Sequence, residues 1–202
     1  MACAESISSI AQAANISETS SQKIGEIVRA LKYYAYSDKD RIDRIRINES
    51  IQTALVLLRN QLKHTVKVVM NCDAALPPIT CSSDIHQVWT NLLTNAVDAM
   101  QQRNEGPEGC IDIETRAEED HIRVSVADNG VGIPQEIMGK IFDPFFTTKD
   151  IGMGTGLGLC IVAGIVKRHG GTIGVESRPG STVFTVRLPM SWKPESVKFQ
   201  PL

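Results

Sequence analysis

The sequence predicts an α+β domain over residues 46–190, a two-layer sandwich in which helices cover one face of a mixed, mostly antiparallel sheet. Two observations carry this prediction. Runs of alternating apolar and polar residues come in pairs joined by short polar turns, which is typical of hairpins. Among these runs lie two segments with an apolar stripe at helical spacing, Asp84–Gln101 and Thr155–His169.

A long bundle helix is expected before this domain. From Ile7 to Ala35, apolar and small residues recur at alternating steps of three and four, which is the seam of a coiled coil or helical bundle. Ser17 and Ser21 occupy seam positions, so the seam is weakest there. Because one long helix cannot cover its own stripe, we expect a homodimer through it, with packing on its own domain as the alternative. Residues 1–45 therefore form a partial dimerisation helix region.

Within the domain, each element has a local signal in spacing or turn chemistry. Ser82 or Ser83 is expected to cap the helix that follows it. Residues 191–202 contain prolines and no periodicity, and we expect a C-terminal tail. The predicted elements are a short strand in Arg41–Asn48, a helix over Glu49–Lys63, a strand over Thr65–Cys72, a helix over Asp84–Gln101, a hairpin of Cys110–Arg116 with His121–Ala127, a helix over Thr155–His169 and a hairpin of Thr172–Ser177 with Thr182–Leu188.

Composition excludes several classes of function. The 202 residues carry a net charge of -2, which gives no electrostatic basis for binding nucleic acid. No apolar run is long enough to cross a bilayer, and the N-terminus lacks the pattern of a signal peptide. The five cysteines are scattered without a C-x-x-C pair, as expected of buried thiols in a reducing compartment. We therefore expect a cytoplasmic location and no membrane contact by these residues.

Two short motifs place polar groups on rigid elements. Asn91 and Asn95 stand four residues apart on one helix face, and an Asn carbonyl is a hard oxygen ligand that suits Mg²⁺. Asp128 directly follows an alternating strand, where a carboxylate can accept from an exocyclic amine such as that of adenine. Gly130 and Gly132 permit close approach of a ligand there. An ordinary polar surface and a plain turn are the respective alternatives.

Two later segments are candidates for a phosphate-binding loop. Three of the five phenylalanines lie in Ile141–Phe146, either as a small core under a loop or as the anchor of a mobile one. Lys149 follows as a point charge for a phosphate. Alternating glycines over Gly152–Leu159 then enter a helix, whose N-terminal amides attract an anion, although a flexible turn is the alternative. No Gly-Lys-Ser/Thr follows, so this is no P-loop.

Taken together and in this order, N-x-x-x-N, D-x-G-x-G, F-x-P-F-F and G-x-G-x-G-L-G-L resemble the N, G1, F and G2 boxes of sensor histidine kinases. These kinases belong to the superfamily of gyrase, Hsp90, histidine kinase and MutL ATPases. The resemblance covers about residues 47–189, and F-x-P-F-F-T-T-K is most similar to the nitrogen-regulation branch. It implies a Bergerat-type ATP-binding fold, with ATP and Mg²⁺ as cofactors.

The resemblance also implies a role for each matching residue. Asn95 would ligate Mg²⁺, and Asn91 would lie near the phosphates, where ATP-hydrolysing relatives place a catalytic Glu. Asp128 would bind the adenine amino group, and Lys149 would act with Asn91 at the γ-phosphate. Phe145 and Phe146 would help to anchor the lid over the nucleotide. The other implied nucleotide-binding residues are Gly130, Gly132, Phe142, Gly154, Thr155, Gly156, Leu157, Gly158 and Thr182.

Two departures from the family pattern narrow this interpretation. Several relatives have a basic residue three positions after the Mg²⁺ ligand, whereas this chain has Asp98, which shifts phosphate neutralisation onto Lys149 and the loop backbone. No histidine stands in a phospho-acceptor motif, and His86 and His169 are expected to be polar surface residues. The histidine-bearing bundle helix would therefore lie outside this chain, and residues 5–35 would be the second helix of the bundle.

Three functions follow as hypotheses. The first is the ATP-binding catalytic part of a two-component sensor histidine kinase, whose partners would be ATP and ADP, a histidine-bearing bundle helix and a response regulator receiver domain. The second is a nucleotide-binding switch without phosphoryl transfer, motivated by the missing histidine. The third is a Ser kinase similar to the anti-sigma kinases, which acid lability of the phosphorylated product would distinguish from the first.

Overall fold

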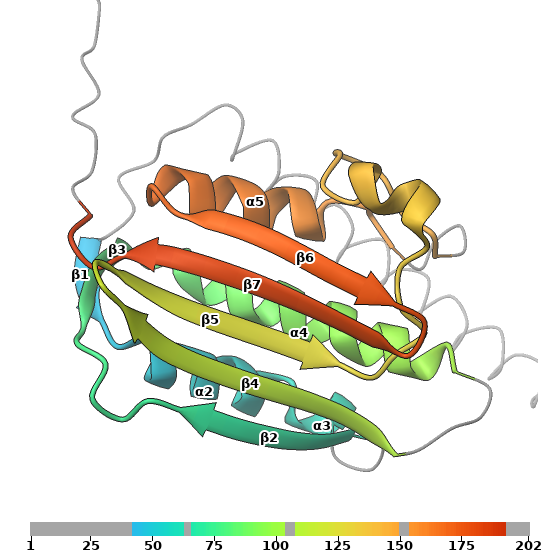
Figure 1. The fold of residues 1–202 in the computed structure, drawn as a ribbon, viewed down its shortest axis with the longest axis horizontal. Coiled ribbons are helices and arrows are strands. Elements are labelled where there is room, and N and C mark those ends of the chain that lie inside the picture. Colours follow the sequence, from blue (N-terminus) through green and yellow to red (C-terminus); the bar gives the residue numbers. More distant parts are fainter. Residues whose placement is uncertain (1–41, 63–65, 104–107, 150–153, 193–202) are drawn as a thin grey trace, which may run out of the picture.

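The computed structural model describes residues 42–62, 66–103, 108–149 and 154–192. The helix predicted before residue 41 and most of the predicted tail lie outside these residues. Figure 1 shows a five-stranded sheet with α2, α4 and α5 on one face, and the predicted two-layer α+β architecture is confirmed. Among the described residues, no helix is both long and apolar enough to span a membrane.

The elements follow the predicted order, with one strand added. The hairpin strands extend the predicted runs by one or two residues at their ends. The bounds are β1 Ile42–Ile45, α2 Ile47–Leu57, α3 Arg59–Leu62, β2 Val66–Cys72, β3 Ile79–Ser82, α4 Ile85–Gln101, β4 Gly109–Glu118, β5 His121–Asp128, the 3₁₀ helix η1 Gln135–Lys140, α5 Gly158–Arg168, β6 Thr172–Arg178 and β7 Ser181–Pro189.

The sheet has the strand order β2-β4-β5-β7-β6. Only β2 and β4 run parallel, because α4 lies between them in the chain and returns it to the same end of the sheet. The other neighbours are antiparallel, and the register between β5 and β7 places Asp128 opposite Thr182. In Figure 1 the ends of β5 and β6 and the start of β7 meet at one edge of the molecule.

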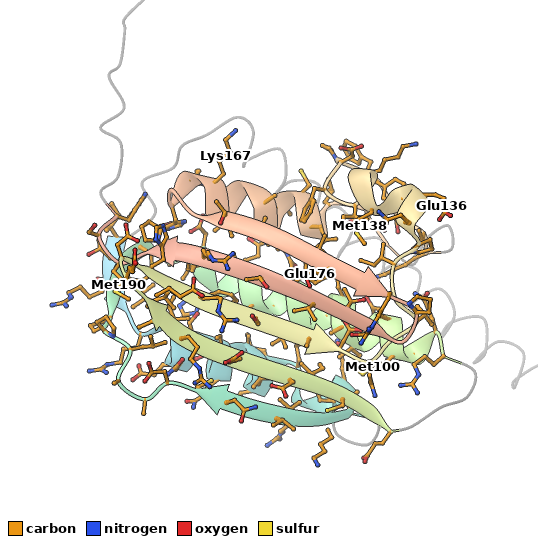
Figure 2. All side chains as sticks on the ribbon, viewed as in Figure 1. Met100, Glu136, Met138, Lys167, Glu176 and Met190 are labelled. Carbon is orange, nitrogen blue, oxygen red and sulfur yellow. The ribbon has the colours of Figure 1, made fainter. Side chains whose placement is uncertain are left out.

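The core lies between the sheet and the three helices. α4 is its centre, because it packs against α2 on one side and α5 on the other. Burying a large apolar side chain is worth about 1.5–3 kcal/mol, so the stripe on α4 contributes strongly to stability. Its buried residues are Ile85, Val88, Trp89, Leu92, Leu93, Ala96, Val97 and Met100. Figure 2 shows the Lys167 side chain on α5 pointing away from the sheet, as expected for an amphipathic helix.

The face of the sheet without helices is polar and held by ion pairs across strands. Arg123 pairs with Glu118 at 2.8 Å and Glu114 at 3.4 Å, and Arg187 pairs with Glu118 at 3.0 Å. Each such pair on an exposed surface is worth about 0–1 kcal/mol. The alternation of these charges with buried residues on the same strands explains why β4, β5 and β7 were predictable.

Three local predictions are wrong. The predicted 49–63 helix breaks at Leu58, which separates α2 from α3. Neither Ser82 nor Ser83 caps the helix, because Asp84 occupies the N-cap position of α4 and makes no side-chain capping bond. The last helix begins at Gly158 and not at Thr155. In addition, β3 was not predicted, since it has only four residues and an alternating pattern that short does not stand out.

His169 is buried, with 2% of its surface exposed, so its predicted surface role is wrong. Its Nδ1–H donates to the Ile165 carbonyl at 2.8 Å, and its Nε2 accepts the Ser82 backbone N–H at 3.0 Å. The Trp192 ring packs against the imidazole in a tilted arrangement, at 4.6 Å between centroids, and its indole N–H donates to the Arg168 carbonyl. The imidazole therefore joins the end of β3, just before α4, to the end of α5.

The other predicted surface histidine, His86, is half-buried between helices. Its Nδ1 lies 2.7 Å from the Ser50 hydroxyl of α2.

The prediction of buried cysteines holds in part. Cys81 and Cys160 are buried, whereas Cys72 and Cys110 are only partly covered. Burial and nearby Asp84 raise the pKa of the Cys81 thiol to about 12. This thiol is therefore unreactive at neutral pH.

Replacing His169 by alanine is expected to lower the free energy of unfolding by about 2–4 kcal/mol. The substitution leaves a cavity and removes the partner of the buried Ser82 N–H. Urea unfolding followed by circular dichroism measures the change. His121→Ala, at a half-exposed strand end, is the matched control and is expected to cost under about 1 kcal/mol. Equal effects of both substitutions would contradict the structural role of His169.

Candidate functional site

A cavity of about 1580 Å³ lies between α4, the start of α5, η1 and the adjoining ends of β6 and β7. It is lined by eleven of the thirteen residues that the sequence predicts for nucleotide or metal binding. Gly130 and Phe142 do not line it. The eleven are Asn91, Asn95, Asp128, Gly132, Lys149, Gly154, Thr155, Gly156, Leu157, Gly158 and Thr182.

One face of α4 forms a wall of this cavity. Asn91, Asn95 and Asp98 line it, as the helical spacing of four and three residues requires. The Asn91 amide nitrogen donates to the Gly158 carbonyl at 3.2 Å, which joins α4 to the first turn of α5. The Asn91 carbonyl oxygen is the part of that amide left to face a ligand. Asn91 therefore positions the start of α5 as well as lining the cavity.

Asp128 ends β5 with only 7% of its surface exposed. Burial raises the pKa of this carboxyl to about 6, and the Gly130 N–H, which donates to Oδ1 at 2.9 Å, partly opposes the shift. A buried carboxylate without a cation beside it needs hydrogen-bond donors. A ligand that brings an amine to Asp128 would supply one.

Thr182 lies beside Asp128 and is buried, and a residue that the sequence analysis missed holds it. The Ser177 hydroxyl lies 2.9 Å from the Thr182 hydroxyl and accepts the Ile133 N–H at 2.8 Å. Ser177 thereby ties the loop after β5 to the hairpin of β6 and β7. No local signal marked Ser177, because it is one polar position of an alternating strand.

Glycine is required at the two positions after Asp128, 130 and 132, for different structural reasons. At Gly130, a Cβ atom would lie 2.6 Å from the Ala99 Cβ, so the loop packs directly on α4. At Gly132, φ is +82° and a Cβ atom would lie 2.4 Å from the Arg178 carbonyl oxygen. Gly130 thus supports the cavity from outside its lining, while Gly132 permits the loop to touch the hairpin.

The phenylalanine segment does not form the anchor of three rings that the sequence predicts. Phe142 is half-buried on the core and does not line the cavity, whereas Phe146 is half-buried and does. Phe145 is 67% exposed and has φ of +67°, a strained conformation for a non-glycine residue. The Phe145 backbone packs closely on Gly156, because a Cβ there would lie 2.3 Å from the Phe145 carbonyl carbon.

Lys149, the predicted phosphate cation, forms an ion pair with Asp98. Both side chains are about a quarter exposed, at 27% and 28%, and both line the cavity. The Lys149 side chain lies against Gly154, whose Cβ would be 3.0 Å from Lys149 Cδ. The cation is therefore already compensated, and no local pattern in the chain predicts this contact.

The cavity suits an elongated ligand with chemically different ends. Gly130 and Asp128 adjoin α4 at Ala99, and Gly158 adjoins it at Asn91, eight residues away. At 1.5 Å per residue these ends are about 12 Å apart along the helix. One end offers a buried carboxylate for an amine, and the other offers an amide oxygen and the N-terminus of α5, which favours an anion.

Comparison with known proteins gives one family and several relatives. The model of histidine kinase-, DNA gyrase B-, and HSP90-like ATPases matches residues 80–191. The sensory histidine kinase/phosphatase NtrB of Rhizobium meliloti is 32% identical over 174 residues, covering 77% of this chain and 44% of the relative. This chain thus spans less than half the length of that relative.

Solved structures match as well. The catalytic domain of histidine kinase ThkA is 35% identical with a TM-score of 0.65, covering 74% of this chain and 98% of that domain. The structure of ThkA in complex with response regulator protein TrrA is 28% identical with a TM-score of 0.63, covering 85% of this chain and 49% of ThkA.

Asp128→Asn is expected to stabilise the ligand-free fold at pH 8 by up to about 3 kcal/mol. Because folding raises the pKa of Asp128 from 3.8 to about 6, the folded state favours the protonated form. The stability that the protonated Asp128 carboxyl contributes is complete below pH 3.8 and is lost as the pH rises through 6. Each pH unit between the two pKa values corresponds to about 1.4 kcal/mol of unfolding free energy. Chemical unfolding at pH 8 and pH 4 should show a gain at pH 8 that nearly vanishes at pH 4. A gain independent of pH would contradict the assignment.

Gly132→Ala is expected to destabilise the fold by at least about 1–2 kcal/mol, because alanine is strained at positive φ and its Cβ would meet the Arg178 carbonyl. Thermal unfolding measures the effect. Gly174→Ala, on β6 with nothing within 4 Å of the added Cβ, is the control and should be neutral or stabilising. A tolerated Gly132→Ala would show that the loop does not contact the hairpin in solution.

Proposed function

The chain belongs to the family of histidine kinase-, DNA gyrase B-, and HSP90-like ATPases, and from this membership we propose that it is the catalytic ATP-binding part of a two-component sensor histidine kinase. The predicted resemblance to sensor histidine kinases is confirmed. The observation that carries the proposal is a single cavity lined by residues of all four motifs. The chain that holds this cavity belongs to a family of ATPases. ATP is the nucleotide this membership supports.

The proposed orientation of ATP follows from the two ends of the cavity. Asp128 accepts a hydrogen bond from the adenine amino group, and the Thr182 hydroxyl holds the base through water. The phosphates lie toward Asn91 and the start of α5, where the helix N-terminus favours an anion. This orientation pairs each end of the ligand with a group of suitable chemistry.

The residues present fit Mg²⁺ bound together with ATP. Among the described residues, no group of three or more His, Cys, Asp or Glu side chains is placed to hold a metal alone. An ion here would therefore depend on phosphate oxygens, water and the amide oxygen of Asn95, a donor set that Mg²⁺ accepts. When bound, Mg²⁺ supplies charge neutralisation at the phosphates. Asn95 and Asn91 lack the carboxylate that would activate water, which favours transfer over hydrolysis.

The proposed acceptor is a histidine outside this chain. The Asn91 amide orients the start of α5, and a nucleotide that fills the cavity excludes water from the transferred phosphoryl group. The ThkA structure in complex with a response regulator supports a receiver domain as the next partner. The dimerisation helix over residues 5–35 and the cytoplasmic location remain predictions, whereas residues 42–45 of the expected helix region form strand β1.

The deciding experiment supplies the chain with radiolabelled ATP, Mg²⁺ and a separate protein bearing a histidine-containing helical bundle. Acid-labile label on the bundle is expected, and chelation of Mg²⁺ should remove it. Asp128→Asn should weaken ATP binding and slow transfer by about 10- to 150-fold, because it loses one charged hydrogen bond. Asp112→Asn, on the open face of the sheet, is the control.

Other outcomes separate the alternatives. Acid-stable label would indicate a Ser kinase, and saturable ATP binding with no label on any acceptor would indicate a nucleotide switch. Unchanged ATP affinity of Asp128→Asn in calorimetry would remove Asp128 from adenine recognition.

A further inference from the structure

The ion pair between Lys149 and Asp98 places the lysine away from the proposed phosphate end. Asp98 lies three residues beyond Asn95 and seven beyond Asn91 on α4. At 1.5 Å per residue it is about 4.5 Å past Asn95 and about 10 Å past Asn91 along the helix axis. The Lys149 ammonium is thus held near the Asp128 end of the cavity, one to two turns from where the terminal phosphate is proposed to lie.

The side chain of Lys149 is also supported in this position. Its Cδ would be 3.0 Å from a Cβ on Gly154, so the absence of a side chain at Gly154 makes room for the aliphatic stem. The neighbouring backbone N–H of Lys149 donates to the Thr147 hydroxyl at 3.2 Å. Two independent contacts, one at the ammonium and one along the stem, therefore define the conformation.

The ion pair between Lys149 and Asp98 is weak enough to be exchanged for another anion. A pair that is about a quarter exposed on both sides is weak, because water screens it. A terminal phosphate carries more negative charge than one carboxylate and attracts the same ammonium more strongly at equal distance. Asp98, left without its cation about 10 Å along α4 from Asn91, would then add uncompensated negative charge to the cavity that holds the phosphates.

We propose that Asp98 is the resting partner of Lys149 and stands in for the terminal phosphate, so that the ammonium exchanges between the Asp98 carboxylate and that phosphate. This inference rests on the proposed function, since it needs ATP in the cavity. Asp98 thereby lowers the affinity for ATP and sets the ratio of ATP to ADP affinity. After the phosphoryl group leaves, Asp98 takes Lys149 back, which favours release of ADP.

Calorimetric titration with Mg-ATP and with Mg-ADP tests the exchange in four proteins: the unmodified chain, Asp98→Asn, Lys149→Gln and the double variant. Asp98→Asn should tighten ATP binding by about two- to tenfold and ADP binding by less, because only ATP has the phosphate that receives Lys149. In the Lys149→Gln background the same substitution should give a smaller gain, which measures repulsion alone. Asp112→Asn controls for net charge.

Each contrary result has a distinct meaning. Weaker ATP binding by Asp98→Asn would overturn the exchange and show that Asp98 supports the nucleotide. If Asp98→Asn tightened ATP and ADP binding equally, or tightened ATP binding equally with and without Lys149, the exchange would also be overturned. Electrostatic repulsion by Asp98 would then be its only effect on binding. An unmodified chain that binds neither nucleotide would overturn the proposed function and the exchange together. Cooperative thermal unfolding of all four proteins confirms that they are folded.

Discussion

The burial of one carboxylate at the end of a central strand is the constraint on which the site depends. The register of β5 against β7 places Asp128 opposite Thr182, and the close packing of Gly130 on α4 keeps that end dry. Burial disfavours the ionised carboxyl, so the ligand-free fold carries an unfavourable interaction that a bound amine would relieve. The fold is therefore less stable than it would be without this group, as is common at functional sites.

Local patterns predicted the sheet well because its outer face is solvated. Alternation along β4, β5 and β7 reports which side chains meet water, and short polar turns report where hairpins reverse. β3 was missed because its four residues after Pro77-Pro78 are too few for an alternating pattern to stand out. Helix bounds were less accurate, since the break at Leu58 does not interrupt the apolar spacing.

The site was predictable as an ordered set of motifs, but its internal contacts were not. Asn91, Asn95 and Asp128 stand on elements whose direction the sequence reveals. The partners of Ser177, His169 and Lys149 depend on how distant segments meet. Phe145 shows the same limit, because its backbone lies against Gly156 across the loop, a contact that its own neighbours in the sequence do not reveal. Long-range register therefore accounts for what sequence reasoning missed.

The one parallel pair in the sheet has a consequence for how the molecule assembles. β2 joins β4 only after the chain has passed through β3 and the whole of α4, so Val66 meets Gly109 across 43 residues of sequence. Contacts between residues so far apart in the sequence form slowly, because closing the long loop costs entropy before the strand pairing stabilises it. The helix that carries Asn91, Asn95 and Asp98 is itself this connection. The helix that forms a wall of the cavity is therefore also the crossover between the two parallel strands.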